Sequence, residues 1–145
     1  MAGTAEAATS TSTFNVTATV QATCTVSATN LAFGVYTGAQ ATGTSAISVA
    51  CTNTTAYQVG LNAGTASGAT VTTRQMTGPS SALLNYALYR DAARTQNWGN
   101  TASTDTVGGT GDGNTRSITV YGTLPAGQPV TPGSYSDTIV VTVTY

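Results

Sequence analysis

The sequence predicts an all-β domain of the sandwich or barrel kind, and three observations lead to this fold class. Val, Ile, Thr and Tyr are prominent, and such β-branched and aromatic side chains pack well on a pleated sheet surface. Apolar and polar residues alternate with period two in several segments, which is the pattern of half-buried strands. Gly, Asn and Pro separate these segments at short intervals, and no segment carries a helical apolar stripe. The length of 145 residues suits one domain.

The chain divides into three regions. Residues 1–12 are small and polar without any pattern, and we expect a flexible leader. Strict alternation then follows and is too long for a single typical strand, so we expect a break near residues 21–23. This organisation predicts an N-terminal strand over residues 13–21 and a single domain over residues 22–145. The apolar residues that share one parity are Phe14, Val16, Ala18, Val20, Ala22, Cys24 and Val26.

Alternation and turn residues predict the remaining elements. Residues 99–114 are polar and rich in glycine, so we expect a long loop there, and residues 90–96 form one helical turn at most. The expected strands cover residues 31–36, 44–51, 56–62, 69–73, 83–89, 116–124 and 135–145.

The last expected strand is apolar and reaches the final residue of the chain. An apolar strand at the edge of a sheet tends to pair with another strand. We therefore expect the N-terminal strand of one copy to complete the sheet of the next copy, which is β-strand addition between molecules. Such a head-to-tail contact produces filaments unless the ring closes. The alternative is that residues 13–26 form the ordinary first strand of a closed monomer.

The chain has two cysteines, Cys24 and Cys51, and no histidine. A metal site would need further Cys, His or clustered acidic residues, so the pair predicts a disulfide and no metal. The disulfide would close a loop of about 28 residues and stabilise the fold by roughly 3–4 kcal/mol. It also implies an oxidising compartment.

Composition argues against several function classes. A net charge of −1 and a charged fraction of 6% provide no basic surface for nucleic acid. No apolar run is long enough for membrane insertion. Without His or Lys the chain lacks the usual base and amine nucleophile, so we predict no enzyme and no cofactor. Tyr86, Tyr89 and Trp98 are a candidate platform for a sugar, although core packing is the favoured interpretation. Residues 108–114 resemble a calcium loop only faintly, and a hairpin loop is favoured.

Several stretches of the chain resemble the spore coat protein U domain family, which includes subunits of archaic chaperone–usher pili of the Csu type. The resemblance extends from about residue 13 to the C-terminus. The stretches are Phe14-x-Val16-x-Ala18-x-Val20 ahead of Cys24, residues 31–34 (LAFG), residues 86–95 (YALYRDAART) followed by Trp98-Gly99, and residues 133–143 (GSYSDTIVVTV).

The resemblance implies an incomplete immunoglobulin-like β-sandwich that lacks its last strand. A periplasmic chaperone would fill the resulting groove temporarily, and an outer-membrane usher would exchange it for the N-terminal strand of the next subunit. Ala18 is smaller than the aliphatic residue that the family often has at this position. By this resemblance the donor-strand residues are Phe14, Val16, Ala18 and Val20, the acceptor groove includes Ile139, Val141 and Val143, and the paired cysteines are Cys24 and Cys51.

The function that the resemblance implies is a structural subunit of a bacterial surface pilus that supports adhesion and biofilm formation. Such a subunit is secreted through the periplasm to the cell surface and polymerises with copies of itself. The alternatives are a secreted spore or cyst coat protein and a sugar-binding adhesin module.

Overall fold

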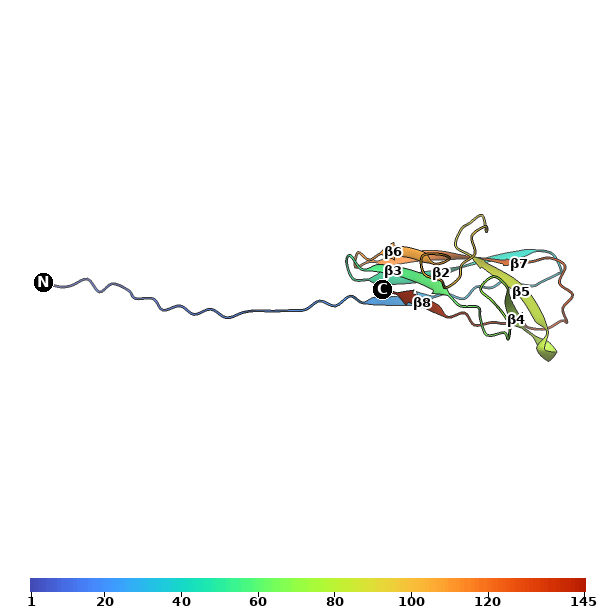
Figure 1. The fold of residues 1–145 in the computed structure, drawn as a ribbon, viewed down its shortest axis with the longest axis horizontal. Coiled ribbons are helices and arrows are strands. Elements are labelled where there is room, and N and C mark those ends of the chain that lie inside the picture. Colours follow the sequence, from blue (N-terminus) through green and yellow to red (C-terminus); the bar gives the residue numbers. More distant parts are fainter.

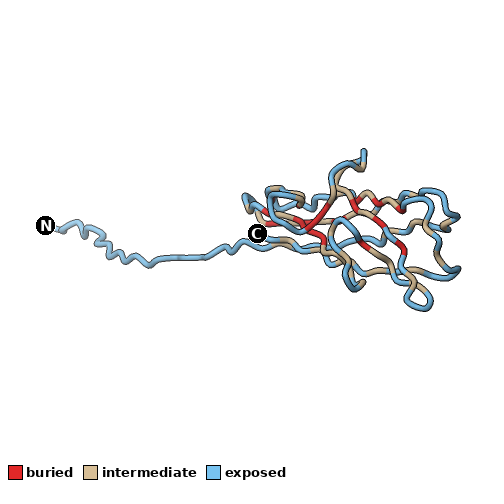
Figure 2. The backbone as a smooth tube through the Cα atoms, turned by 45° about the vertical axis from the view of Figure 1, so that its right-hand side comes forward, coloured by how far each residue is buried: buried red, intermediate tan, exposed pale blue.

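The computed structural model describes residues 1–145 and consists of a β-sandwich with a long N-terminal extension (Figure 1). Residues 1–23, called the arm below, are exposed and belong to no strand. The arm projects away from the sandwich, and the C-terminus lies at the same end of the sandwich (Figures 1 and 2). We call this end the arm end and the opposite one the far end.

Eight strands form two sheets in which every pairing is antiparallel. The larger sheet has the order β1-β2-β7-β5-β4 and the smaller one has the order β6-β3-β8. A short 3-10 turn, η1, covers Pro79–Ser81. The strands are β1 (Cys24–Ala28), β2 (Ala41–Cys51), β3 (Ala56–Leu61), β4 (Arg74–Thr77), β5 (Leu83–Tyr89), β6 (Val107–Thr110), β7 (Thr115–Leu124) and β8 (Val141–Thr144).

The core lies between the sheets and follows the alternation of β2, β3, β5 and β7, whose inward side chains are buried (Figure 2). Trp98 is fully buried, and its indole N–H donates to the carbonyl of Val59 at 2.9 Å. Arg74 is also fully buried and has no carboxylate partner. Its guanidinium donates instead to the backbone carbonyls of Leu61, Asn62, Val71 and Trp98. Burial lowers the pKa of Arg74, and these bonds hold the loops around the end of β3.

The all-β fold is confirmed, and four expected strands correspond closely to β2, β3, β5 and β7. The expected strand over residues 31–36 is wrong, because Gly34 has a φ of +76° and the segment runs without a ladder partner. The expected strand over residues 69–73 is instead a turn. The N–H of Thr73 closes this turn by donating to both the hydroxyl and the carbonyl oxygen of Thr70. The strand β4 follows that turn.

Two further expectations needed correction. The polar loop over residues 99–114 contains β6, which pairs with β3. Gly109 makes this pairing possible, because a Cβ atom there would lie 2.4 Å from the hydroxyl oxygen of Tyr57. The strand expected over residues 135–145 is reduced to β8. Ahead of β8 the side chain of Asn62 bonds the Val140 N–H at 2.9 Å, in place of a regular backbone ladder.

Candidate functional site: an open groove between two sheet edges

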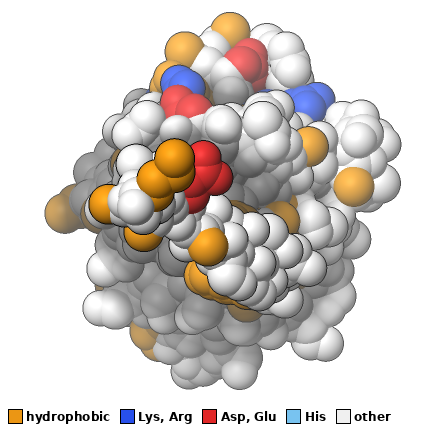
Figure 3. All heavy atoms as spheres, turned by 90° about the vertical axis from the view of Figure 1, so that its left-hand side faces the viewer, with side chains coloured by type: hydrophobic (Ala, Val, Ile, Leu, Met, Phe, Trp, Pro, Cys, Tyr) orange, Lys and Arg blue, Asp and Glu red, His pale blue; other side chains and the backbone are white.

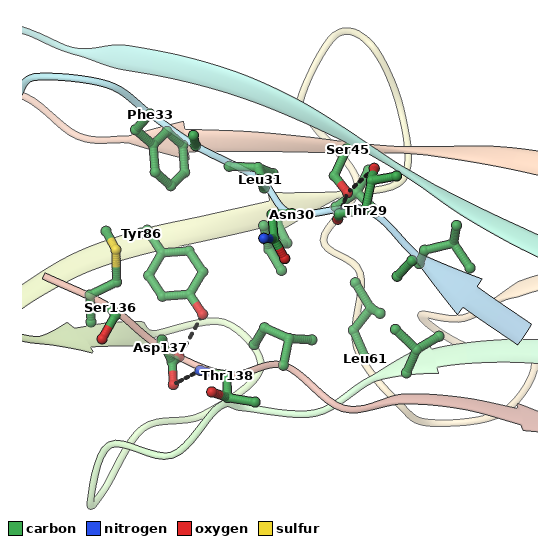
Figure 4. A pocket seen from close by; sticks show the side chains of 18 of the residues that line it. Thr29, Asn30, Leu31, Phe33, Ser45, Leu61, Tyr86, Ser136, Asp137 and Thr138 are labelled. Carbon is green, nitrogen blue, oxygen red and sulfur yellow. Dashed lines mark hydrogen bonds between the residues drawn. The ribbon is translucent and has the colours of Figure 1, made fainter.

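An apolar groove of about 690 Å³ opens between the two sheets (Figure 4). One wall is residues 28–33, which continue from β1, and the other is residues 135–141, which lead into β8. We call these the β1 wall and the β8 wall. The floor consists of side chains from the strands between them, chiefly Ile47, Leu61, Met76, Tyr86, Leu88 and Val120.

The walls continue from edge strands, because β1 pairs only with β2 and β8 pairs only with β3. Within the β8 wall, Ser136 also exchanges backbone hydrogen bonds with Thr77 of β4. On the β8 wall, the N–H and C=O of Val140 both bond Asn62 on the β3 side. Successive residues of an extended chain point their polar groups in opposite directions. Ile139 and Val141 therefore present their N–H and C=O groups toward the groove. The groove thus offers apolar floor and unpaired backbone together, which is what an additional β-strand requires.

Two glycines in the larger sheet allow the β1 wall to pack closely against it. Gly43 and Gly122 are direct partners across β2 and β7. A Cβ atom on Gly122 would lie 2.9 Å from the side chains of both Leu31 and Phe33, and one on Gly43 would lie 2.9 Å from the Ala32 carbonyl. The wall therefore approaches the sheet as closely as it does because these two positions lack side chains.

Replacing Gly122 with Val is expected to lower the free energy of unfolding by about 1–3 kcal/mol, since the added methyl groups must displace Leu31 and Phe33. Urea unfolding of the parent and the variant measures this loss. Thr119→Val, at an exposed position of the same strand, is the matched control and should stay within about 0.5 kcal/mol of the parent. Equal stability of the two variants would contradict the glycine argument.

The far part of the groove contains a hydrogen-bonded pair of polar side chains. The hydroxyl of Tyr86 donates to Oδ2 of Asp137 at 2.6 Å (Figure 4). Oδ1 of Asp137 accepts from the N–H and hydroxyl of Thr65 and from the N–H of Thr138, each at 2.8 Å. Burial favours a raised pKa for Asp137, but these hydrogen bonds outweigh it and lower the pKa. Burial, and then the bond to Asp137, raises the pKa of Tyr86.

The lowered pKa of Asp137 predicts acid sensitivity. A carboxyl with a lower pKa in the folded state contributes stability above its ordinary pKa of 3.8, and this contribution disappears as the pH falls through the folded value. We expect Asp137→Asn to be less stable than the parent at pH 7 and the difference to shrink below pH 3.8. Thermal unfolding of both proteins between pH 2 and pH 7 tests this, and a difference that is constant with pH would contradict it.

The arm carries large apolar side chains that contact nothing. Phe14, Val16 and Val20 are 86%, 85% and 88% exposed. Viewed from the arm end, hydrophobic side chains are scattered among mostly polar and backbone atoms, with few charged groups (Figure 3). The root of the arm is fixed, because Thr23 exchanges hydrogen bonds with Thr52 and the next residue is the disulfide-bonded Cys24.

The structure places the sequence-predicted site residues in four locations. Phe14, Val16, Ala18 and Val20 lie on the arm, away from the groove. Ile139 and Val141 line the β8 wall, whereas Val143 lies outside the groove, opposite Val59 in the ladder of β3 and β8. Cys24 and Cys51 form the disulfide, with a Cα–Cα distance of 4.1 Å.

Most of the groove residues were not predicted from the sequence. The alternating pattern of residues 83–89 indicated that Leu84, Tyr86 and Leu88 share one face, but did not show that part of this face remains open. Other groove residues that were not anticipated are Leu31, Phe33, Ile47, Met76, Val120 and Tyr135.

The aromatic sugar platform is wrong for this fold. Trp98 is fully buried and Tyr86 is 6% exposed, so neither ring presents a face to solvent.

In the glycine-rich loop, Asp112 accepts from Arg116 at 2.6 Å and from the Asn114 N–H. No helix in the structure has the length and hydrophobicity needed to span a membrane.

Fold and groove together define a class of protein: an immunoglobulin-like β-sandwich with an open edge and an N-terminal extension. One chain in the crystal structure of a CsuC–CsuE chaperone–tip adhesion subunit pre-assembly complex, from archaic chaperone–usher Csu pili of Acinetobacter baumannii, has the same fold. The TM-score is 0.66 at 20% identity, over 88% of this chain and 41% of that one.

The chain belongs to the Spore Coat Protein U domain family, which residues 10–142 match. A curated relative is Protein U of Myxococcus xanthus. The two sequences are 37% identical over 158 aligned residues, covering 97% of this chain and 88% of the relative.

Proposed function

We propose that this chain is a structural subunit that polymerises head to tail, with the arm of one copy filling the groove of the next. The observation that carries the proposal is that one chain has both an unfilled apolar groove with free backbone edges and an exposed arm whose alternating apolar side chains nothing covers. Each feature supplies what the other lacks. Apolar surface of this kind is a docking site or an aggregation hazard when left open.

The lengths of the two features agree. From Phe14 to Val20 the donor strand advances six residues, and from Tyr135 to Val141 the β8 wall also advances six. At about 3.3 Å per residue both spans are roughly 20 Å. All four donor side chains therefore fit along one wall.

The positions of the chain ends favour one direction for the inserted strand. The arm and the C-terminus leave the sandwich at the same end (Figure 1). A linear fibre needs the next domain at the far end, so the donor strand runs antiparallel to β8, with Phe14 near Val141 and Val20 near Tyr135. A chain's own arm would have to reverse at residues 21–23 and run parallel to β8. The geometry therefore favours insertion between copies.

The partners and the location follow from the same groove. An unpolymerised subunit exposes the groove, and a periplasmic chaperone is the natural temporary cover; an outer-membrane usher would exchange it for the next arm. The Csu complex in the comparison is itself a chaperone–subunit complex. The Cys24–Cys51 disulfide suits assembly in the oxidising periplasm, with the fibre displayed at the cell surface. There the fibre would support adhesion and biofilm formation.

A second candidate is a component of a spore or cyst coat, which the name of the matched domain family favours. A coat would use the same joint between copies. Electron microscopy separates the two functions, because a pilus appears as filaments that project from cells, whereas a coat appears as a continuous layer.

The test compares the full chain with a variant in which residues 12–21 are moved behind Tyr145 through a short turn. In the variant the donor strand runs antiparallel to β8 within its own chain. We expect filaments and a ladder on an unboiled denaturing gel from the parent, and a stable monomer from the variant. A parent that stays a well-folded monomer, together with a misfolded variant, would mean that residues 13–26 belong inside the sandwich.

A further inference from the structure

We propose that the hydrogen-bonded pair Tyr86–Asp137 sets the register of the incoming strand, by leaving room only for the small side chain of Ala18 at the third donor position. This inference rests on the proposed function and adds to it a specificity-determining element. The pair lies inside the groove, and Ala18 is the smallest of the four donor residues.

The register follows from the matching spacing of strand and wall. Residues 135, 137, 139 and 141 share one parity, and all of them line the groove, as do Ser136 and Thr138 between them. An antiparallel strand that fills the groove from end to end places its third inward residue, Ala18, opposite Asp137, which is the third of these positions counted back from Val141. The resulting pairs are Phe14 with Val141, Val16 with Ile139, Ala18 with Asp137, and Val20 with Tyr135.

Side chains from three directions meet at this third position. The side chain of Tyr86, which belongs to β5 on the floor, donates a hydrogen bond to Asp137 on the β8 wall (Figure 4). Phe33 on the β1 wall packs its ring edge-on against the ring of Tyr86, with 6.3 Å between the centroids. Two aromatic rings, one from the floor and one from the β1 wall, therefore line the groove at this position.

The pair also explains why a shifted strand is disfavoured. Asp137 already has its oxygens occupied by Tyr86, Thr65 and Thr138, so a small apolar residue can cover it without breaking a bond. A shift by two residues would bring Val16 or Val20 onto the pair, and the added bulk would separate the hydroxyl from the carboxylate. A shift by one residue would turn the polar face of the strand into the groove.

The first test enlarges the third position. In the full chain, Ala18→Leu is expected to reduce polymer yield by about tenfold or more, the range that overpacking of a close-fitted site produces. Val16→Ile is the matched control, because it adds bulk at the second position, and should polymerise like the parent. The double variant Ala18→Leu/Tyr86→Ala should recover polymer. Parent-like polymerisation of Ala18→Leu would overturn the proposal.

The second test reads the register directly and does not depend on the folding of a Tyr86 variant. A chain with Val20→Cys and Tyr135→Cys should form a disulfide between neighbouring subunits under mild oxidation. A chain with Val16→Cys and Tyr135→Cys should not. The opposite result would overturn the proposed register. If the parent forms no polymer at all, the proposed function fails; if it polymerises and Ala18→Leu does too, only the register proposal fails.

Discussion

Replacing Val16 with Asp is expected to abolish polymer formation and to leave the free energy of unfolding of the domain unchanged. Val16 is 85% exposed in the single chain, so the substitution removes no contact there. In the joint the same side chain would lie beside Ile139 over the apolar floor, where a buried carboxylate without a partner costs several kcal/mol. Unboiled denaturing gels and negative-stain microscopy measure assembly, and thermal unfolding measures stability.

The neighbouring residue supplies the control for that experiment. Thr17 has the opposite parity, so Thr17→Asp places the same charge on the face of the strand that points away from the groove. We expect Thr17→Asp to polymerise and Val20→Asp to fail as Val16→Asp does. Equal polymer yields from Val16→Asp and Thr17→Asp would show that residues 13–21 are not the donor strand.

Removing the disulfide is expected to cost about 3–4 kcal/mol of stability, because Cys24 and Cys51 close a loop of about 28 residues. For a domain of this size the loss corresponds to a fall in Tm of roughly 10–20 °C. The measurement compares Cys24→Ser/Cys51→Ser with the parent, both carrying Val16→Asp so that monomers are compared.

Both cysteines are replaced in this experiment so that neither variant contains a free thiol. Reducing agent provides the control, since it should lower the Tm of the parent background and leave the double serine variant unchanged. Equal melting temperatures in the absence of reductant would mean that the hydrogen-bonded ladder of β1 and β2 alone fixes this part of the domain.

Local pattern predicted those parts of the fold whose side chains alternate between the core and solvent. The strands β2, β5 and β7 have this property. The strand β6 does not, because the two central residues of its four are glycines, which pack against the side chains of Tyr57 and Gln58. Glycine is ordinarily a sign of a loop or a bend, so a sequence pattern alone assigns this segment wrongly.

The groove depends on contacts between residues that are far apart in the sequence. The close packing of Leu31 and Phe33 against the larger sheet requires Gly43 and Gly122 to be cross-strand partners. No short stretch of the sequence contains this information. Tyr86 and Asp137 are separated by 51 residues. Shared parity groups Ile139, Val141 and Val143, of which Ile139 and Val141 line the groove. It does not show where the groove ends, and β1 and β8 contact each other.

The short connection at the root of the arm has a mechanical consequence for a fibre. Only Gln21 and Ala22 separate Val20 from Thr23, which is bonded to Thr52. Two residues extend by roughly 7 Å at most, so a joint under tension has almost no slack. Pulling force would pass from the arm through Cys24–Cys51 into β2, which has a neighbouring strand on each side. The covalent bond would thereby protect the edge strand β1 from being peeled off the sheet as the fibre is stretched.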